Sequence, residues 1–257
     1  MSTQALILNF ILKKYIKSVR PSVEDSSYTD VRKMMNQKGY EDKNQNFISK
    51  LLVKKIFNKN KSDLNISELY LNKIRTLKFS SPTFNQEKCI LYFHGGGYVA
   101  GSPETHQNFL MALAKKSRIS IYAIDYSLAP EKKYPAALND AVASYRSLLD
   151  MGYKEENIFM GGDSAGGNLT LVSALKLQEE GNKLPIKLFL LSPWTNLTAS
   201  GESIKLNSEK DPYLSYDNFL STSHSMKKAV EEWYAPNEDY KNPLISPVFA
   251  NFNSFPE

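Results

Sequence analysis

A serine between two pairs of glycines is the most conspicuous candidate for chemistry in this sequence. Residues 160–168 read Met-Gly-Gly-Asp-Ser-Ala-Gly-Gly-Asn, so Ser164 has Gly162 and Gly166 two positions to either side. The segment follows a short apolar run and opens a helical one, which is the setting of a nucleophile elbow. Glycines at those two positions remove side chains that a sharp turn would bring into collision. The pattern predicts that Ser164 presents its hydroxyl at a helix N-terminus, where developing negative charge is favoured.

A run of three glycines after a histidine, His94–Gly97, directly follows another apolar run. Glycines let the backbone approach a ligand and turn its N–H groups toward it, as the stabilisation of a tetrahedral oxyanion requires. We expect the donors to be the N–H groups of Gly96, Gly97 and Ala165, the residue after the serine. His94 is expected to pack against this loop and to hydrogen-bond it, and not to transfer protons.

The same glycines allow a second interpretation. Gly95-x-Gly97-x-x-Ala100 matches the looser form of the dinucleotide-binding fingerprint, and an acid, Asp125, follows the next apolar run. However, the Ser-Pro pair at 102–103 interrupts the helix that this fingerprint must open. Asp125 also comes 28 residues after Gly97, where the fingerprint has its acid about 20 residues on. We therefore favour the oxyanion interpretation and expect no cofactor.

Short β-rich runs alternate with helical stretches after residue 73, whereas residues 1–72 are charged and helical in pattern. The expected strands are 74–79, 89–93, 119–124, 157–160 and 188–191, and the expected helices are 105–116, 137–150 and 166–180. Continuous apolar strands separated by helices of 10–15 residues are typical of a mostly parallel sheet that is covered on both faces. The sequence therefore predicts an α/β protein.

Further blocks complete a resemblance to a known family. They are Asp125–Glu131 (Asp-Tyr-Ser-Leu-Ala-Pro-Glu), Tyr134–Ala137, Ser192–Trp194 and Asn242–Pro247, in order with the two glycine segments. From about residue 73 to its last residue, the chain resembles the hormone-sensitive-lipase-like family of α/β-hydrolase carboxylesterases. It departs from the family pattern at Ser127, where an arginine is usual.

The resemblance implies an α/β-hydrolase fold, with a mostly parallel central sheet, helices on both faces and an N-terminal helical cap over the acyl pocket. It divides the chain into a cap region at 1–72 and a core at 73–257, with a helical cap insertion near 196–240. It implies a serine carboxylesterase that forms an acyl-enzyme on Ser164. The supporting motif residues would be His94, Gly95, Gly162, Asp163, Gly166 and Gly167.

In this family an acid and then a histidine follow the serine, each after a later strand. Because 93 residues follow Ser164, we expect both triad partners and the last strands to be absent from this chain. The sole later histidine is His224, with Asp211 and Asp217 upstream, but no strand is expected just before it that would return it to the site. By the family's sheet order, the strand 188–191 would then be an unpaired edge.

Bulk composition is that of an ordinary globular protein, with 257 residues, 42% hydrophobic and 23% charged. A single cysteine, Cys89, fits a reducing, cytoplasmic location. The net charge of +5 arises in residues 1–79, which hold 16 Lys and Arg against 7 Asp and Glu, and it does not indicate nucleic-acid binding. No apolar run is long enough for a bilayer. The amphipathic stretch at 8–19 is expected to dock on the protein itself, not on a membrane.

The sequence thus predicts a small-molecule ester as substrate, with no metal and no nucleic-acid partner. It leaves open a homo-oligomer or a complementing C-terminal chain. The alternative function is a catalytically inactive, truncated α/β-hydrolase product, or a protein that keeps the acyl pocket to bind esters.

Overall fold

The computed structural model describes residues 27–36, 64–207, 229–252 and 255. The strands are β1 Asn65–Leu71, β2 Ile74–Ser80, β3 Asn85–Phe93, β4 Ile119–Ile124, β5 Ile158–Asp163 and β6 Lys187–Leu191. The helices are α2 Tyr28–Asn36, α4 Gln107–Ser117, α5 Ala136–Asp150, α6 Ala165–Glu179 and α7 Glu202–Leu206, with the helical turns η1 Glu155–Asn157, η2 Ala229–Tyr234 and η3 Pro247–Phe249.

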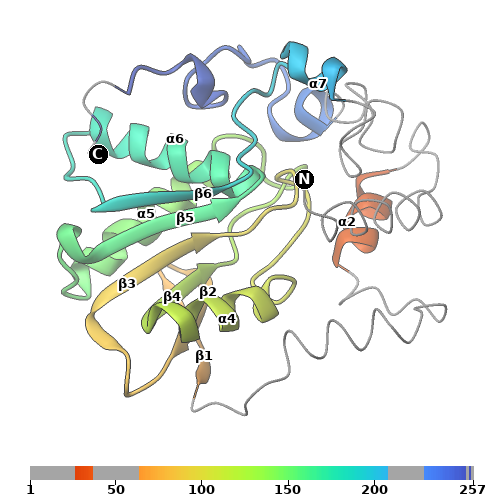
Figure 1. The fold of residues 1–257 in the computed structure, drawn as a ribbon. Helices are drawn as coiled ribbons and strands as arrows, with labels where there is room; N and C mark the ends of the chain where they lie inside the picture. Colours follow the sequence, from red (N-terminus) through yellow and green to blue (C-terminus); the bar gives the residue numbers. More distant parts are fainter. Residues whose placement is uncertain (1–26, 37–63, 208–228, 253–254, 256–257) are drawn as a thin grey trace.

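The six strands form one sheet in the order β1-β2-β4-β3-β5-β6 (Figure 1). Strands β4, β3, β5 and β6 are mutually parallel, and β1 and β2 extend the sheet antiparallel at one side. The expected mostly parallel sheet is therefore confirmed. Each parallel crossover runs through a helix, because parallel strands cannot be joined by a tight turn.

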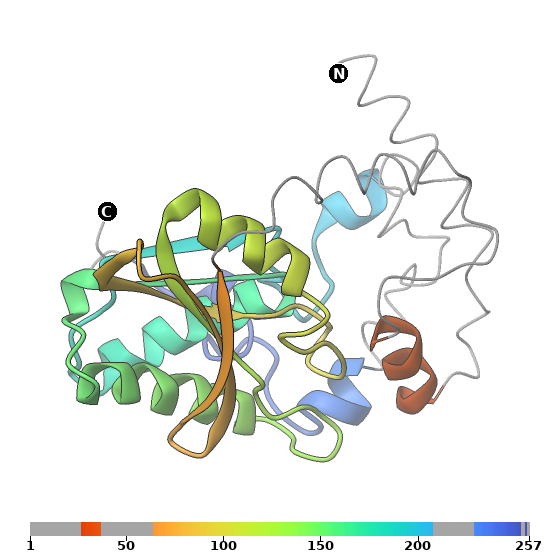
Figure 2. The ribbon, with the colours of Figure 1, turned by 90° about the horizontal axis from the view of Figure 1, so that it is seen from below.

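Two apolar layers enclose the sheet, and the alternation along the central strands builds both. In β3, Cys89, Leu91 and Phe93 face the layer that α5 and α6 cover, while Ile90 and Tyr92 face the layer under α4. Figures 1 and 2 show α4 on one side of the sheet and the pair α5 and α6 on the other. A strand buried on both faces must be apolar at consecutive positions, which explains the continuous apolar run that the sequence displays.

The sheet begins earlier in the chain than we expected. Residues 65–71 lie in the range 1–72 that was expected to be helical, yet they form β1, which pairs antiparallel with β2. Their burial alternates, with Ser67, Leu69 and Leu71 more buried than their neighbours, as in a strand at the side of a sheet. Most of the expected N-terminal cap, including the amphipathic stretch at 8–19, lies outside the described residues.

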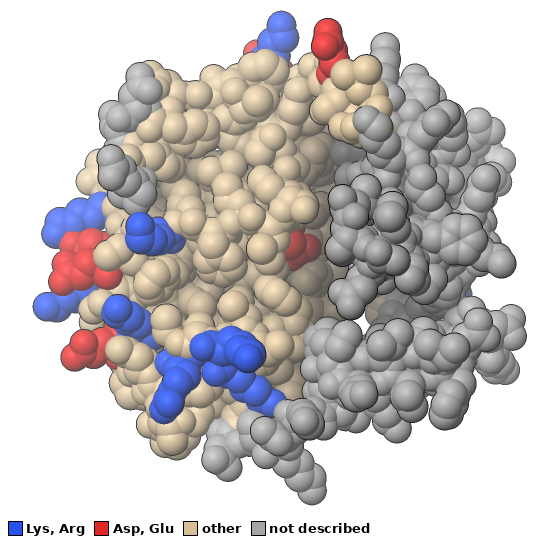
Figure 3. All heavy atoms as spheres, in the orientation of Figure 1, with Lys and Arg blue, Asp and Glu red and all other residues tan. Residues whose placement is uncertain are grey.

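Strand β6 is the other edge of the sheet among the described residues, as the resemblance predicts for 188–191. Its side chains are only partly buried, and Leu191 is 41% exposed. In the orientation of Figure 1, much of the described surface is uncharged, with positive side chains gathered toward the lower left and a small negative patch near the middle (Figure 3). Among the helices that the structure describes, none has the length and hydrophobicity of a transmembrane segment.

Candidate active site

Ser164 occupies the turn between β5 and α6, with φ 52° and ψ −117°, and its side chain is exposed. A non-glycine residue in this conformation is strained and persists only where its surroundings hold it. Here the Ser164 N–H donates to the Leu191 carbonyl at 3.0 Å, and the Ser164 carbonyl accepts from the N–H of Trp194 at 2.9 Å. The start of α6 and the end of β6 therefore fix the strained turn that the sequence predicts.

The glycines around the serine are required by close packing against the end of β3. A Cβ on Gly162 would lie 2.5 Å from the Phe93 carbonyl oxygen and from the backbone of Gly166. A Cβ on Gly166 would collide with the carbonyl oxygens of Phe93 and His94. A Cβ on Gly167 would lie 2.9 Å from the side chain of Pro193. These contacts are the structural reason for glycine at these three positions of the motif.

Residues 94–101, which we call the glycine loop, leave the end of β3 beside this turn. The N–H groups of Val99 and Ala100 both donate to the Gly96 carbonyl, which closes the loop on itself. Gly96 and Gly97 have φ values of 132° and 63°, and a Cβ on Gly96 would collide with the Ala100 carbonyl. Within the residues that the structure describes, the N–H groups of Gly96 and Gly97 donate no hydrogen bond. Among the described residues, the loop therefore has two backbone donors without an acceptor.

Asp163 joins the glycine loop to the serine turn. Its carboxylate accepts from the Gly95 N–H at 3.0 Å and from the Tyr92 hydroxyl at 2.7 Å, and it lies 3.3 Å from Nε2 of His106. Burial alone would raise the pKa of Asp163, but the hydrogen bonds and positive charge of His106, with those other donors, lower the pKa below its usual value. A Cβ on Gly95 would collide with the same carboxylate, so the Asp163 side chain fits here because residue 95 is a glycine.

The two described histidines near Ser164 have opposite environments. His94 is 1% exposed, stacks on Tyr126 with ring centroids 4.3 Å apart, and its Nδ1 lies 2.8 Å from the Gly95 carbonyl. Burial lowers the pKa of His94 to about 4, so its ring is neutral at neutral pH. For His106 burial would also lower the pKa, but the hydrogen bond and charge of Asp163 outweigh it, and the pKa is raised. His94 packs in the loop as expected, and His106 is held by a carboxylate.

Not every sequence expectation falls on described residues. His224, Asp211 and Asp217 lie outside the described residues. The helix α4 begins at Gln107, with His106 as its N-cap, and the Thr105 hydroxyl donates to the Ser102 carbonyl. In the described part of the chain, no group of three or more His, Cys, Asp or Glu side chains gathers as a metal site would require.

Sequence reasoning overlooked two side chains of α2, Arg32 and Asn36, which contact the glycine loop directly. Arg32 Nε donates to the Val99 carbonyl at 2.7 Å, and Asn36 Oδ1 accepts from the Gly101 N–H at 2.8 Å. It also missed the pairing of His106 with Asp163. The two α2 contacts could not be predicted from sequence, since no local motif marks an arginine or asparagine as the hydrogen-bond partner of backbone groups far away in the chain.

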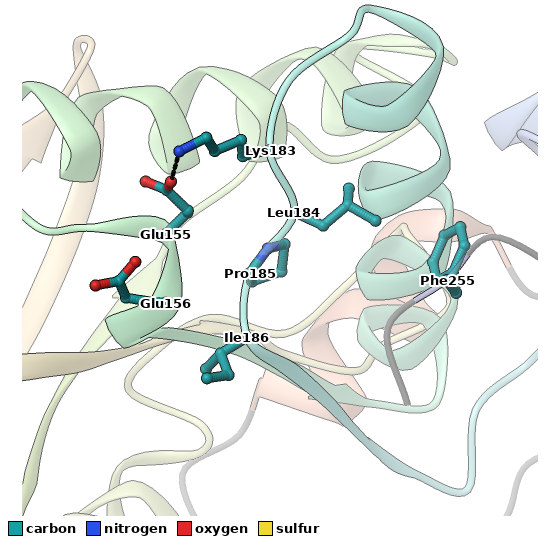
Figure 4. A pocket seen from close by; sticks show the side chains of 7 residues that line it. All are labelled: Glu155, Glu156, Lys183, Leu184, Pro185, Ile186 and Phe255. Atoms are coloured by element: carbon teal, nitrogen blue, oxygen red, sulfur yellow. Dashed lines mark hydrogen bonds and ion pairs between the residues drawn. The ribbon is translucent and has the colours of Figure 1, made fainter.

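A pocket of about 470 Å³ lies near the opposite ends of strands β5 and β6 from Ser164 (Figure 4). It is formed by η1, by the segment that leads into β6, and by Phe255; the lining residues are Glu155, Glu156, Lys183, Leu184, Pro185, Ile186 and Phe255. These segments precede the starts of β5 and β6, whereas Ser164 follows the end of β5. The pocket is therefore separate from the candidate active site.

The fold and the serine turn define an α/β hydrolase, and comparisons with known proteins agree. The family model described as the alpha/beta hydrolase fold matches residues 90–257. The chain is 31% identical over 167 residues to an esterase of Acinetobacter venetianus, covering 65% of this chain and 53% of that protein. The structure of EstE5, soaked with p-nitrophenyl butyrate, superposes with a TM-score of 0.79 at 29% identity and covers 100% of this chain and 76% of that one.

An esterase from the bacterial hormone-sensitive lipase family superposes with a TM-score of 0.78 at 27% identity, over 100% of this chain and 76% of its own. The chain belongs to the α/β-hydrolase family and, within it, to the hormone-sensitive-lipase-like esterases. It spans about half the length of the curated relatives that it matches first.

Proposed function

We propose that this chain carries the nucleophile, Ser164, and the backbone oxyanion donors of a carboxylic ester hydrolase. The observation that carries the proposal is an exposed serine on a strained turn, beside a loop with two backbone donors that have no acceptor among the described residues, in a chain of esterase ancestry. In the first step, Ser164 Oγ attacks the ester carbonyl carbon and loses its proton to a base. The carbonyl oxygen becomes an oxyanion, the alcohol leaves with a proton, and water later releases the acid.

The oxyanion would be held by backbone donors. The N–H groups of Gly96 and Gly97 are unused within the described residues, and Ala165 is the first residue of α6, whose N–H has no partner inside its own helix. The positive end of the α6 dipole adds to the stabilisation. One such donor is typically worth on the order of 10²–10³ in kcat.

Neither described histidine near Ser164 is suited to act as its base. His94 is buried, neutral and engaged with the Gly95 carbonyl, and His106 is paired with Asp163. We propose that the catalytic histidine and acid are not among these 257 residues, and that a further segment or a second polypeptide supplies them and completes the site. Without a base the serine hydroxyl is a poor nucleophile, and turnover falls by about 10⁶.

The proposed substrate is a small ester, and the proposed cap comprises the residues before β1 together with the insertion near 196–240. The soaked relative EstE5 shows that p-nitrophenyl butyrate is a sensible first probe, since its structure was determined after exposure to that ester.

The test is covalent labelling of Ser164 by a fluorophosphonate, followed by mass spectrometry of the peptide that contains residues 160–168. We expect one label per chain on Ser164, none in Ser164→Ala, and hydrolysis of p-nitrophenyl acetate or butyrate far below ordinary esterase rates. Absence of labelling under a large excess of probe would favour the alternative of a non-catalytic, ester-binding protein. Ser164-dependent turnover at ordinary rates would instead place the base within this chain and overturn our location for it.

A further inference from the structure

Three residues on one face of the helix α2 contact the rest of the protein, two of them at the glycine loop and one at η2. Tyr28, Arg32 and Asn36 follow each other at intervals of four residues, so they project from the same side of a helix. Tyr28 packs edge-on against Trp233 of η2, with ring centroids 6.2 Å apart. In Figures 1 and 2, α2 lies beyond the ends toward which the arrows of the parallel strands point. This is the end of the sheet where Ser164 lies.

Arg32 binds two loops at once. Its Nε donates to the Val99 carbonyl and its Nη2 to the Ala129 carbonyl, each at 2.7 Å. The two terminal nitrogens also donate to the Glu131 carboxylate oxygens, at 2.6 and 2.7 Å. The Arg32 side chain is 25% exposed and that of Glu131 is 50% exposed, so the ion pair itself contributes little. The hydrogen bonds from Arg32 to the Val99 and Ala129 carbonyl oxygens therefore give this contact its specificity.

Asn36 fixes the far end of the same loop. Its Oδ1 accepts from the N–H of Gly101, whose φ of 91° is a left-handed conformation. The loop has an anchor on each side of the Gly96 and Gly97 N–H groups: Gly95 is held by Asp163, and Val99 and Gly101 are held by α2. The donors of Gly96 and Gly97 lie between these anchors, in a stretch where glycine torsions are otherwise free.

We propose that α2 is a positioning element for the glycine loop, with Arg32 and Asn36 as the residues that orient the N–H groups of Gly96 and Gly97. The effect of α2 on catalysis rests on the proposed function of Ser164. The mechanical statement, that α2 restrains residues 96–101, is independent of it. Neither side chain contacts the reacting atoms, so both act through the backbone that they hold.

The decisive experiment measures amide hydrogen exchange of peptides that cover residues 94–101, in the full chain. We expect exchange to accelerate about tenfold in Arg32→Met and in Asn36→Leu, because lost hydrogen bonds lower the free energy of local opening. Asn36→Asp keeps an acceptor oxygen for the Gly101 N–H and should restore protection. Arg146→Met is the matched control, since Arg146 pairs with Glu180 at a different surface site. A peptide that covers β4 reports global opening.

Unchanged exchange in both Arg32→Met and Asn36→Leu would overturn the proposal. So would equal acceleration in β4, or an Asn36→Asp variant that behaves like Asn36→Leu. The catalytic meaning is read separately, from the rate of fluorophosphonate labelling of Ser164. We expect this rate to fall about tenfold in Arg32→Met at unchanged Tm. If wild type is not labelled at all, the proposed function fails while the exchange data still decide whether α2 restrains the loop. An unchanged labelling rate beside a loosened loop would remove the catalytic role of α2.

Discussion

The serine turn and the glycine loop meet at one site, but they are held in place in different ways. The turn at 162–167 is dictated by glycines and by a helix that starts within the same short segment. The glycine loop is held by side chains remote in sequence, 68 residues away for Asp163, 67 for Arg32 and 65 for Asn36. The first region therefore depends on close steric fit, partly against the end of β3, and the second depends on hydrogen bonds from remote side chains.

This difference has a physical basis. A tight turn needs particular torsions and the absence of particular Cβ atoms, and both are properties of the residues in the turn. A loop with several glycines has no preferred conformation of its own, so ordering it costs more conformational entropy and must be offset by contacts from elsewhere. The turn should thus be sensitive to added atoms, and the loop to removed hydrogen-bond partners.

The largest expected effect comes from adding one methyl group to the turn. In Gly166→Ala the new Cβ would collide with the Phe93 and His94 carbonyl oxygens, and backbone cannot move aside as a side chain can. We expect a loss of about 3 kcal/mol or more in the free energy of unfolding, measured by urea denaturation. If too little soluble variant is obtained for this measurement, a decrease in the soluble fraction on expression, relative to wild type, reports the same destabilisation.

Two further alanine variants sharpen the comparison. Gly97→Ala meets nothing closer than 4.0 Å, so only its left-handed φ of 63° is penalised, by about 1 kcal/mol. Gly201→Ala has no such φ and its nearest neighbour is 3.7 Å away, so it should be close to neutral. Equal losses in Gly166→Ala and Gly97→Ala would mean that the turn and the loop are not distinguished by steric fit.

What the sequence could predict follows the same division. The glycine spacing around Ser164 and the apolar runs of β3, β4, β5 and β6 gave the fold and the turn, because each is a property of contiguous residues. Strand β1 was missed, since its half-exposed alternation is weak next to the lysine-rich residues before it. The contacts of Arg32 and His106 could not be foreseen, because they depend on where the fold places residues far apart in the chain.

An intermediate effect is expected from removing the carboxylate that joins the two regions. In Asp163→Ala the Gly95 N–H and the Tyr92 hydroxyl lose their acceptor, and an unpaired buried donor costs about 1–3 kcal/mol. We expect a loss of about 2 kcal/mol in unfolding free energy, together with faster amide exchange in residues 94–101. Asp163→Asn is the control, since its amide oxygen can still accept from both donors. If Asp163→Asn lost as much unfolding free energy as Asp163→Ala, the charge of the carboxylate would matter more than its hydrogen-bond geometry.

The smallest effect is a pH dependence that separates His106 from His94. The pKa of His106 is raised in the folded state, so its contribution is complete below the ordinary value of 6.5 and is lost as the pH rises through its raised pKa. The pKa of Asp163 is lowered, so its contribution is present above the ordinary value of 3.8 and is lost as the pH falls through its lowered pKa. The His106–Asp163 pair therefore stabilises the fold most between these two values.

His106→Gln tests this window, because the glutamine amide can still donate to Asp163 but cannot become charged. We expect wild type to exceed the variant by on the order of 1 kcal/mol near pH 5, and the difference to shrink at alkaline pH, in urea unfolding across the pH range. His94 acts in the opposite sense: its folded pKa of about 4 means that stability falls as the pH drops below 6.5. Because wild type and variant share His94, its effect cancels in the difference. A difference that stays flat with pH would show that the carboxylate does not hold a protonated His106, and that the loop depends on hydrogen-bond geometry alone.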